Sequence, residues 1–154
     1  MTTIAYRDGL MAADSQASTE SYLEKTPCQK IYQIACDDSA AWGGALVGLA
    51  QGSFAGLVFL EWLKGKRSRE EMSFDLMQDD DFLSLVVHHG KISIWNRYLV
   101  PDYPASDMTF WAIGSGAKVA LGAMECGATA EEAVRVAAKY DLFTGGEIVT
   151  ARAQ

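Results

Sequence analysis

The chain has 154 residues, of which 20 are acidic and 13 are basic, so its formal net charge is −7. This excess of negative charge argues against nucleic acid or an anionic membrane as the main partner. Hydrophobic residues make up 49% of the chain, which disfavours disorder and predicts one compact domain over residues 1–154.

The start of the chain and its cysteines bear on where the protein works. The first residues contain no basic segment followed by a long apolar core, so we expect no signal peptide. Cys28, Cys36 and Cys126 are odd in number and lack the spacing of zinc ligands. We therefore expect three reduced, partly buried thiols in a cytoplasmic protein, with no metal and no other cofactor.

The first residue after Met1 is a candidate nucleophile. Removal of Met1 would leave Thr2 with a free α-amine, whose pKa ordinarily lies close to neutral pH. The hydroxyl could then attack a carbonyl carbon while the amine accepts its proton. This pairing is an established way of activating a weak hydroxyl nucleophile. Because a small residue after Met1 is common, the remainder of the chain must support this hypothesis.

Two hairpins are expected in the first fifty residues. Residues 4–6 and 10–13 are apolar and flank an Asp-Gly turn, so their pairing would bring Asp14 close to Thr2. Residues 30–34 and 40–50 form a second pair of runs. Lys30 begins this hairpin, where its ammonium could lie beside a carboxylate and lower the pKa of a nearby hydroxyl or amine.

The uncharged stretch 39–60 has two interpretations. Its glycines recur at every fourth position from residue 44 to residue 56, as they do in packed membrane helices. The alternative is a buried strand through Leu49, a turn at 50–52 and a helix capped by Ser53. We favour the second interpretation, because Gln51 and Ser53 would otherwise lie in the middle of a bilayer.

The next segments continue the alternation of strands and helices. One short helix should begin at about Ser68, where Glu71 completes a capping box. Residues 82–88 and 92–98 then form a hairpin, and residues 108–113 form another strand.

The last third of the chain is predicted to hold two helices and a strand. The helices cover residues 117–125 and 130–139, and Thr129 with Glu132 forms a capping box before the second. The final strand covers residues 147–151. This order of elements suits two packed sheets with helices on the outside.

Other residue clusters in the sequence do not predict a metal or phosphate site. His88 and His89 are neighbours on a predicted strand, so their side chains should point to opposite faces and would not share a metal. Residues 79–81 are three consecutive aspartates, which we interpret as a solvated loop. Gly114-Ser115-Gly116 precedes a helix but lacks the lysine and the spacing of a P-loop. Ser115 could be a supporting catalytic hydroxyl or only a helix cap.

Six segments together resemble one family, the HslV peptidase and proteasome β-type subunits, which are N-terminal-nucleophile hydrolases. They occur in the family's order across nearly the whole chain: the opening Thr-Thr-Ile, residues 12–17 (AADSQA), Lys30 before an apolar strand, residues 45–53 with a glycine turn, residues 112–116 with a second glycine turn, and residues 141–146 (DLFTGG). The resemblance implies an α+β fold, a four-layer αββα sandwich of two antiparallel sheets. The helical layer would be shortened between residues 64 and 81.

The resemblance also implies roles for particular residues. The catalytic set would be Thr2, Asp14, Lys30, Ser115, Asp141 and Thr144. A backbone N–H of Gln51 or Gly52 would form the oxyanion hole, and Leu49 would line the substrate pocket. Two positions depart from the family's usual pattern, since Gln51 replaces a glycine and Thr144 replaces a serine.

The function implied is that of a threonine-type peptidase subunit within a self-compartmentalising protease. Peptides or unfolded proteins would be its substrates, a homo-oligomeric ring its assembly and an AAA+ ATPase unfoldase a further partner. Two alternatives stay open: a catalytically inactive ring or shell subunit, and a small-molecule amidase on the same fold.

Overall fold

The computed structural model describes residues 2–18, 23–36, 41–50, 54–76, 82–103 and 108–153. Strands β1 (Thr3–Arg7) and β2 (Leu10–Asp14) form the first hairpin. Its turn is Asp8-Gly9, and both residues have positive φ, 49° and 80°. These angles match the primed turns that suit the twist of two-residue hairpins. The Asp-Gly signal in the sequence thus predicted this hairpin correctly.

Two more strands complete this first sheet. Strand β9 (Phe110–Gly114) pairs with β1, and β10 (Ile148–Arg152) pairs with β2, so the order is β10-β2-β1-β9 with all neighbours antiparallel. The two ends of the chain therefore lie in the same sheet. Because the starts of β1 and β10 both lie beside the end of β2, the segments that precede β1 and β10 come together at one end of the first sheet.

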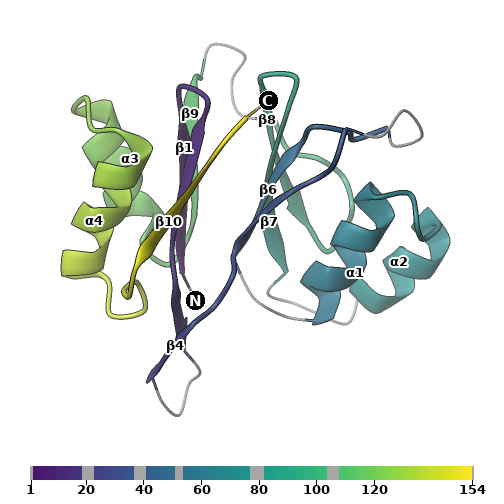
Figure 1. The fold of residues 1–154 in the computed structure, drawn as a ribbon, viewed down its shortest axis with the longest axis horizontal. Coiled ribbons are helices and arrows are strands. Elements are labelled where there is room, and N and C mark those ends of the chain that lie inside the picture. The colour runs from purple at the N-terminus through teal and green to yellow at the C-terminus, as the bar shows by residue number, and fades with distance from the viewer. Residues whose placement is uncertain are drawn as a thin grey trace.

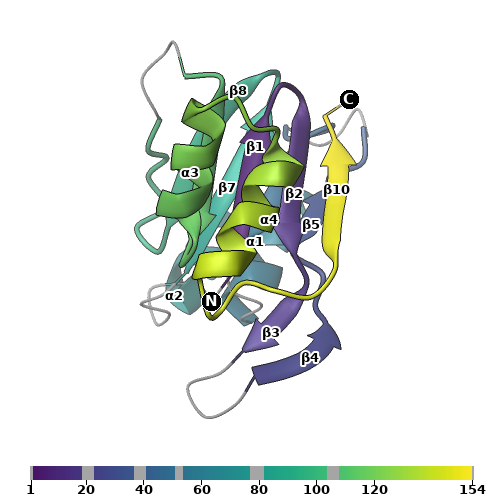
Figure 2. The same ribbon diagram turned by 90° about the vertical axis from the view of Figure 1, so that its left-hand side faces the viewer.

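The second sheet is formed by the middle of the chain. Its strands are β5 (Ile31–Gln33), β6 (Leu46–Leu49), β7 (Leu83–His88) and β8 (Lys91–Asn96), and they are antiparallel in the order β5-β6-β7-β8. A small hairpin of β3 (Gln16–Ser18) and β4 (Leu23–Pro27) connects β2 to β5 along the chain and projects beyond the end of the two packed sheets (Figure 2). The sequence did not predict this hairpin, since its short polar strands lack apolar alternation.

Helices cover the outer face of each sheet. Figure 1 shows the four layers from one side to the other: α3 (Ala117–Glu125) and α4 (Ala130–Tyr140), the first sheet, the second sheet, then α1 (Phe54–Leu63) and α2 (Arg69–Leu76). Figure 2 shows α3 and α4 lying over the first sheet. The predicted αββα sandwich is confirmed. Helix α2, in the segment expected to be short, has eight residues.

The helix starts follow the predicted capping boxes. Thr129 accepts a hydrogen bond from the N–H of Glu132, whose carboxylate accepts the N–H of Thr129 at 2.8 Å. Ser68 and Glu71 make the same reciprocal pair before α2, at 3.0 and 3.3 Å. These bonds satisfy N–H groups that a helix start leaves without partners.

Three hydrophobic clusters hold the layers together. One lies between the sheets and includes Ile4, Tyr6 and Met11. The other two lie under the helices, one between α1 and the second sheet and one between α3, α4 and the first sheet. Ala5 belongs to the cluster under α3 and α4. Successive residues of β1 therefore face opposite sides, as expected for a strand.

Two expectations about individual side chains were wrong. The rings of His88 and His89 lie 4.0 Å apart, because His89 belongs to the turn, with φ of 49°, and not to the strand. Cys36 and Cys126 are exposed, whereas all three cysteines were expected to be partly buried, and only Cys28 is. Among the described helices, none combines the length and apolar character needed to cross a bilayer.

Candidate active site

A buried carboxylate lies at the centre of the site. Asp14 ends β2 and is 1% exposed. Its Oδ1 accepts hydrogen bonds from the hydroxyl of Thr2, from the N–H of Thr3 at 2.9 Å and from the ammonium of Lys30 at 3.0 Å. A buried carboxylate needs such donors, because leaving it unpaired would cost several kcal/mol. The first hairpin creates the contact between Asp14 and Thr2, as the sequence predicted.

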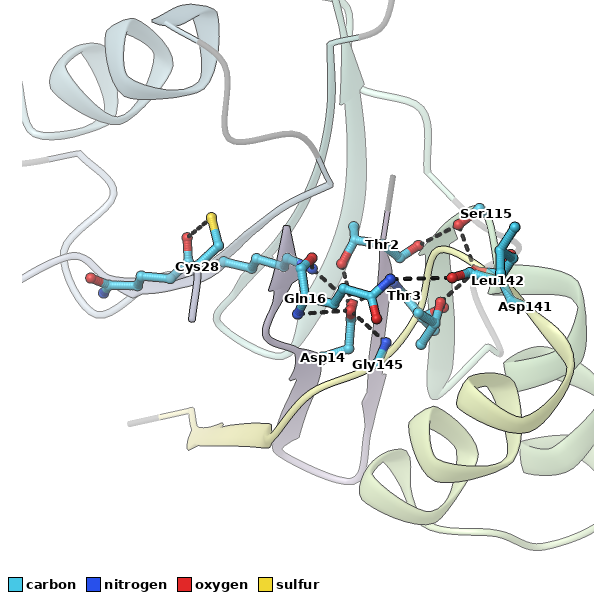
Figure 3. A network of polar contacts seen from close by, with 12 residues as sticks. Thr2, Thr3, Asp14, Gln16, Cys28, Ser115, Asp141, Leu142 and Gly145 are labelled. Carbon is cyan, nitrogen blue, oxygen red and sulfur yellow. Dashed lines mark hydrogen bonds and ion pairs between the residues drawn. The ribbon is translucent and has the colours of Figure 1, made fainter. Parts of the chain in front are cut away.

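The other oxygen of this carboxylate is bound by backbone groups. Asp14 Oδ2 accepts the N–H of Gln16 at 3.2 Å and the N–H of Gly145 at 3.0 Å. Gln16 also binds the segment after α4. Its N–H reaches the carbonyl of Gly145 at 2.9 Å, and its side-chain amide donates to the carbonyl of Leu142 at 3.1 Å. Gln16 therefore fastens the 142–145 segment to Asp14 (Figure 3).

Lys30 supplies the positive charge of the site. It directly precedes β5 and is 6% exposed. Its ammonium donates to Asp14 and, at 2.7 Å, to the carbonyl of Gln16. Burial lowers the pKa of Lys30, and the charge and hydrogen bond of Asp14 partly oppose that shift. The amine therefore gives up its proton more readily than a solvated lysine does, while its ammonium form favours a deprotonated neighbour.

A second carboxylate lies on the other side of Thr2. The hydroxyl of Ser115 donates to Asp141 Oδ2 at 2.7 Å and lies 3.3 Å from the carbonyl oxygen of Thr2. The hydroxyl of Thr144 donates to the same Asp141 oxygen. A serine has one hydroxyl hydrogen, so Ser115 bound to Asp141 keeps its lone pairs available as acceptors toward the start of the chain.

The turn between β9 and α3 explains how these groups can approach Thr2. Gly114 has φ of 97°, and a Cβ there would lie 2.0 Å from the carbonyl oxygen of Thr2. The N-cap of α3 is Gly116, with no side-chain cap bond. The hydroxyl of Ser115 is therefore directed to Asp141 and not to the helix start. The Gly-Ser-Gly sequence serves close approach, which only glycine permits.

Hydrogen bonds connect all six predicted catalytic residues into one region, and Figure 3 labels four of them, Thr2, Asp14, Ser115 and Asp141. Gln51 and Gly52, the predicted oxyanion hole, lie outside the described residues. Leu49, predicted to line the substrate pocket, is 2% exposed within the cluster under α1, and its N–H donates to the carbonyl of Lys30 at 2.9 Å.

Sequence reasoning missed two members of this region, Thr3 and Gln16. Thr3 is completely buried, and its hydroxyl lies 2.6 Å from that of Thr144. The one available signal for Thr3 was alternation: a residue next to Thr2 should face the opposite side, toward the C-terminal helices. For the Gln16 side chain the sequence held no signal, because its amide donates to the carbonyl of Leu142, 126 positions away.

Comparison with models of known protein families and with curated sequences finds no match. Solved structures do match over nearly the whole chain. Eukaryotic HslV from Trypanosoma brucei is 15% identical with a TM-score of 0.64, and the match covers 97% of each chain. BPH from Thiobacillus denitrificans in complex with epoxomicin is 16% identical with a TM-score of 0.67, covering 99% of this chain and 98% of that one. A further structure of the same BPH is 18% identical with a TM-score of 0.66 and the same coverage.

These likenesses show the fold. The layers and strand order described above form an α+β fold, an αββα sandwich of two antiparallel sheets. More particularly, the fold is that of HslV and BPH, as the sequence motifs implied.

Proposed function

We propose that the chain is the subunit of a cytoplasmic, self-compartmentalising threonine peptidase, with Thr2 as its nucleophile after removal of Met1. The observation that carries this proposal is the hydrogen bond from the Thr2 hydroxyl to Asp14, a carboxylate that is itself paired with Lys30. The Thr2 hydroxyl and the Lys30 ammonium donate to the same buried Asp14 oxygen, which supports an activated nucleophile at Thr2.

The proposed reaction has two steps. In the first, the Thr2 oxygen bonds to the carbonyl carbon of a peptide, its proton passes to the α-amine, and the C–N bond breaks as the departing amine takes up that proton. In the second, the oxygen of water bonds to the carbonyl carbon of the resulting ester, the bond between that carbon and the Thr2 oxygen breaks, the acyl part of the peptide leaves as a carboxylic acid, and Thr2 regains its hydroxyl hydrogen from the water. The ammonium of Lys30 would stabilise the negative charge on the Thr2 oxygen as the proton leaves.

The second carboxylate would orient the amine. Once Met1 is removed, the backbone nitrogen of Thr2 becomes the free α-amine. Ser115 contacts the carbonyl oxygen of Thr2, and its hydroxyl already donates to Asp141. We infer that Ser115 accepts a hydrogen from this amine, with Thr144 holding Asp141 in place. A backbone N–H of Gln51 or Gly52 remains our proposal for the oxyanion hole.

A peptidase assay with matched variants tests this proposal. Short fluorogenic peptides should be cleaved by the wild type and not by Thr2→Ala, while Thr2→Ser should retain part of the activity because it keeps a hydroxyl. Thr150→Ala, an exposed position on β10, serves as the matched control and should match the wild type. Equal rates in wild type and Thr2→Ala would contradict the proposal and favour the shell-subunit alternative.

Epoxomicin offers a second test, since it is bound in one of the BPH structures. If this chain binds it through Thr2, epoxomicin should raise the midpoint of thermal unfolding of the wild type and not of Thr2→Ala, because a ligand stabilises only the state it binds. Hydrolysis of small amides in the absence of any peptide hydrolysis would instead favour the amidase alternative.

A further inference from the structure

Thr3 connects the two carboxylate clusters of the site. Its backbone N–H donates to Asp14 at 2.9 Å, and its hydroxyl lies 2.6 Å from the hydroxyl of Thr144. Thr144 in turn donates to Asp141. The residue is 0% exposed and directly follows the proposed nucleophile. A single buried residue thus contacts one carboxylate through its main chain and reaches the other through one intervening hydroxyl.

Counting hydrogens gives the direction of this chain of contacts. An ionised carboxylate only accepts, so the single hydroxyl hydrogen of Thr144 is directed to Asp141. The Thr144 oxygen can therefore only accept from Thr3, and the Thr3 hydroxyl is the donor. Without that donor, Thr144 would leave a buried lone pair unsatisfied and would lose the contact that fixes its rotamer.

The surroundings are shaped to fit this contact. A Cβ on Gly116 would lie 2.1 Å from the Thr3 oxygen and 3.1 Å from the Thr144 oxygen. The absence of a side chain at Gly116 therefore makes the room in which the two hydroxyls meet. Thr3 faces α4 here, since the same Cβ would lie 3.1 Å from the Cβ of Ala137.

We propose that Thr3 is a positioning residue for the reaction of Thr2, acting through Thr144 and Asp141 on one side and through Asp14 on the other. This inference rests on the proposed peptidase function. The two carboxylates serve different ends of the same nucleophile, its hydroxyl and its amine. Because Thr3 is bonded to both clusters, it sets the distance between them. Its hydroxyl should matter for the rate of the chemical step and not for the binding of substrate.

The test compares Thr3→Val, which keeps the branched shape and removes the donor, with Thr3→Ser, which keeps the donor. We expect Thr3→Val to lower kcat by roughly 10-fold or more with KM unchanged, as for loss of one positioning hydrogen bond. Thr3→Ser should recover most of that loss. Thr150→Val, on the exposed edge strand of the same sheet, is the matched control and should leave both constants unchanged.

A double-variant cycle measures whether the effects of two substitutions on kcat add, which distinguishes positioning through Thr144 from a purely structural role. If Thr3 acts through Thr144, the Thr3→Val and Thr144→Val effects on kcat should not add, because both remove the same hydrogen bond. Full kcat in Thr3→Val, equal loss in Thr3→Val and Thr3→Ser, or additive effects in the cycle would each overturn the proposal for Thr3. If Thr3→Val does not fold, Thr3→Ala, which also removes the donor, takes its place, and a wild-type kcat there would overturn the proposal equally.

The same assay separates this proposal from the one on which it rests. A wild type that is faster than Thr2→Ala but insensitive to Thr3→Val leaves the peptidase proposal standing and removes the role of Thr3. A wild type no faster than Thr2→Ala removes both.

Discussion

At the scale of single residues, the site depends on hydroxyl groups that each have only one hydrogen to donate. Ser115 gives its hydrogen to Asp141, so we expect Ser115→Ala to release that carboxylate and misplace the amine of Thr2. The resulting fall in kcat should be roughly 10²-fold, the lower range for general acid–base groups. Steady-state kinetics check this, with Ser68→Ala as the control. Ser68 caps α2, far from Thr2 in the fold, so its loss should reduce stability and leave kcat unchanged.

Lys30 should impose a dependence of stability on pH. Burial lowers its pKa below the ordinary 10.5. In the interval below 10.5 the unfolded chain therefore binds more protons than the folded chain, and stability rises with pH there. Relative to Lys30→Met, the wild type should gain free energy of unfolding as pH rises toward 10.5. Urea titrations of both chains across this range measure the difference, and a difference that falls with pH would contradict the burial of Lys30.

The residues that sequence reasoning could place are those tied to local signals. Asp14 follows from a hairpin whose turn is written in the sequence, and Lys30 from the start of the next apolar run. Ser115, Asp141 and Thr144 were implied by family resemblance, because no local signal connects Ser115 to Asp141, which lies 26 positions away. Thr3 and Gln16 escaped both routes, since their partners are set by how α4 and its following segment pack on the first sheet.

At the scale of elements, the turn between β9 and α3 is the most constrained segment near the site. Gly116→Ala would place a Cβ against the Thr3 and Thr144 hydroxyls. We expect a loss of about 1–3 kcal/mol in the free energy of unfolding, as for other overpacked sites, together with a large fall in kcat. Gly114→Ala should be at least as damaging, because its φ of 97° adds backbone strain.

A glycine in the helix that follows provides the matched control. A Cβ at Gly122, within α3, would meet nothing within 4 Å. Gly122→Ala should therefore raise stability by about 0.5–1 kcal/mol, because alanine favours the helix, and should leave kcat unchanged. Urea unfolding and peptide hydrolysis are measured on Gly114→Ala, Gly116→Ala and Gly122→Ala. Equal tolerance at Gly116 and Gly122 would show that the Gly-Ser-Gly turn is not needed for close approach.

The sequence predicted the ends of helices and strands best where it holds a strong end signal, such as a capping box. Helix α3 matches its predicted range, and α4 begins after the capping box that predicted it. Strands β5 and β6 are shorter than the apolar runs that suggested them. Ile34 and Ala50 lie just beyond these strands and are also buried, so apolar composition alone cannot mark a strand end.

At the scale of the whole molecule, we expect a closed homo-oligomer. An exposed peptidase site would endanger other proteins, so a chamber is the natural arrangement for this activity. Phe54 and Leu57 are 68% and 54% exposed on α1 and offer an apolar surface for subunit contact. Light scattering at micromolar concentration should give a mass several times that of the 16.7 kDa chain.

A surface variant tests whether α1 takes part in the contacts between subunits. Leu57→Glu changes a side chain that is already half exposed, so it should alter the stability of the single chain by no more than about 0.5 kcal/mol. If Leu57 is covered in the assembly, the variant should shift the mass toward the monomer. A wild type that is monomeric and fully active would remove the chamber, and with it the reason for proposing an unfoldase partner.

The proposed mechanism requires Thr2 to have a free amine when it acts as nucleophile. The test compares two preparations that differ in Met1 alone, one released from a cleavable fusion to begin at Thr2 and one retaining Met1, each verified by intact mass. We predict peptide hydrolysis by the form that begins at Thr2 and none above the Thr2→Ala background by the form that retains Met1. Equal activity in the two forms would contradict the mechanism.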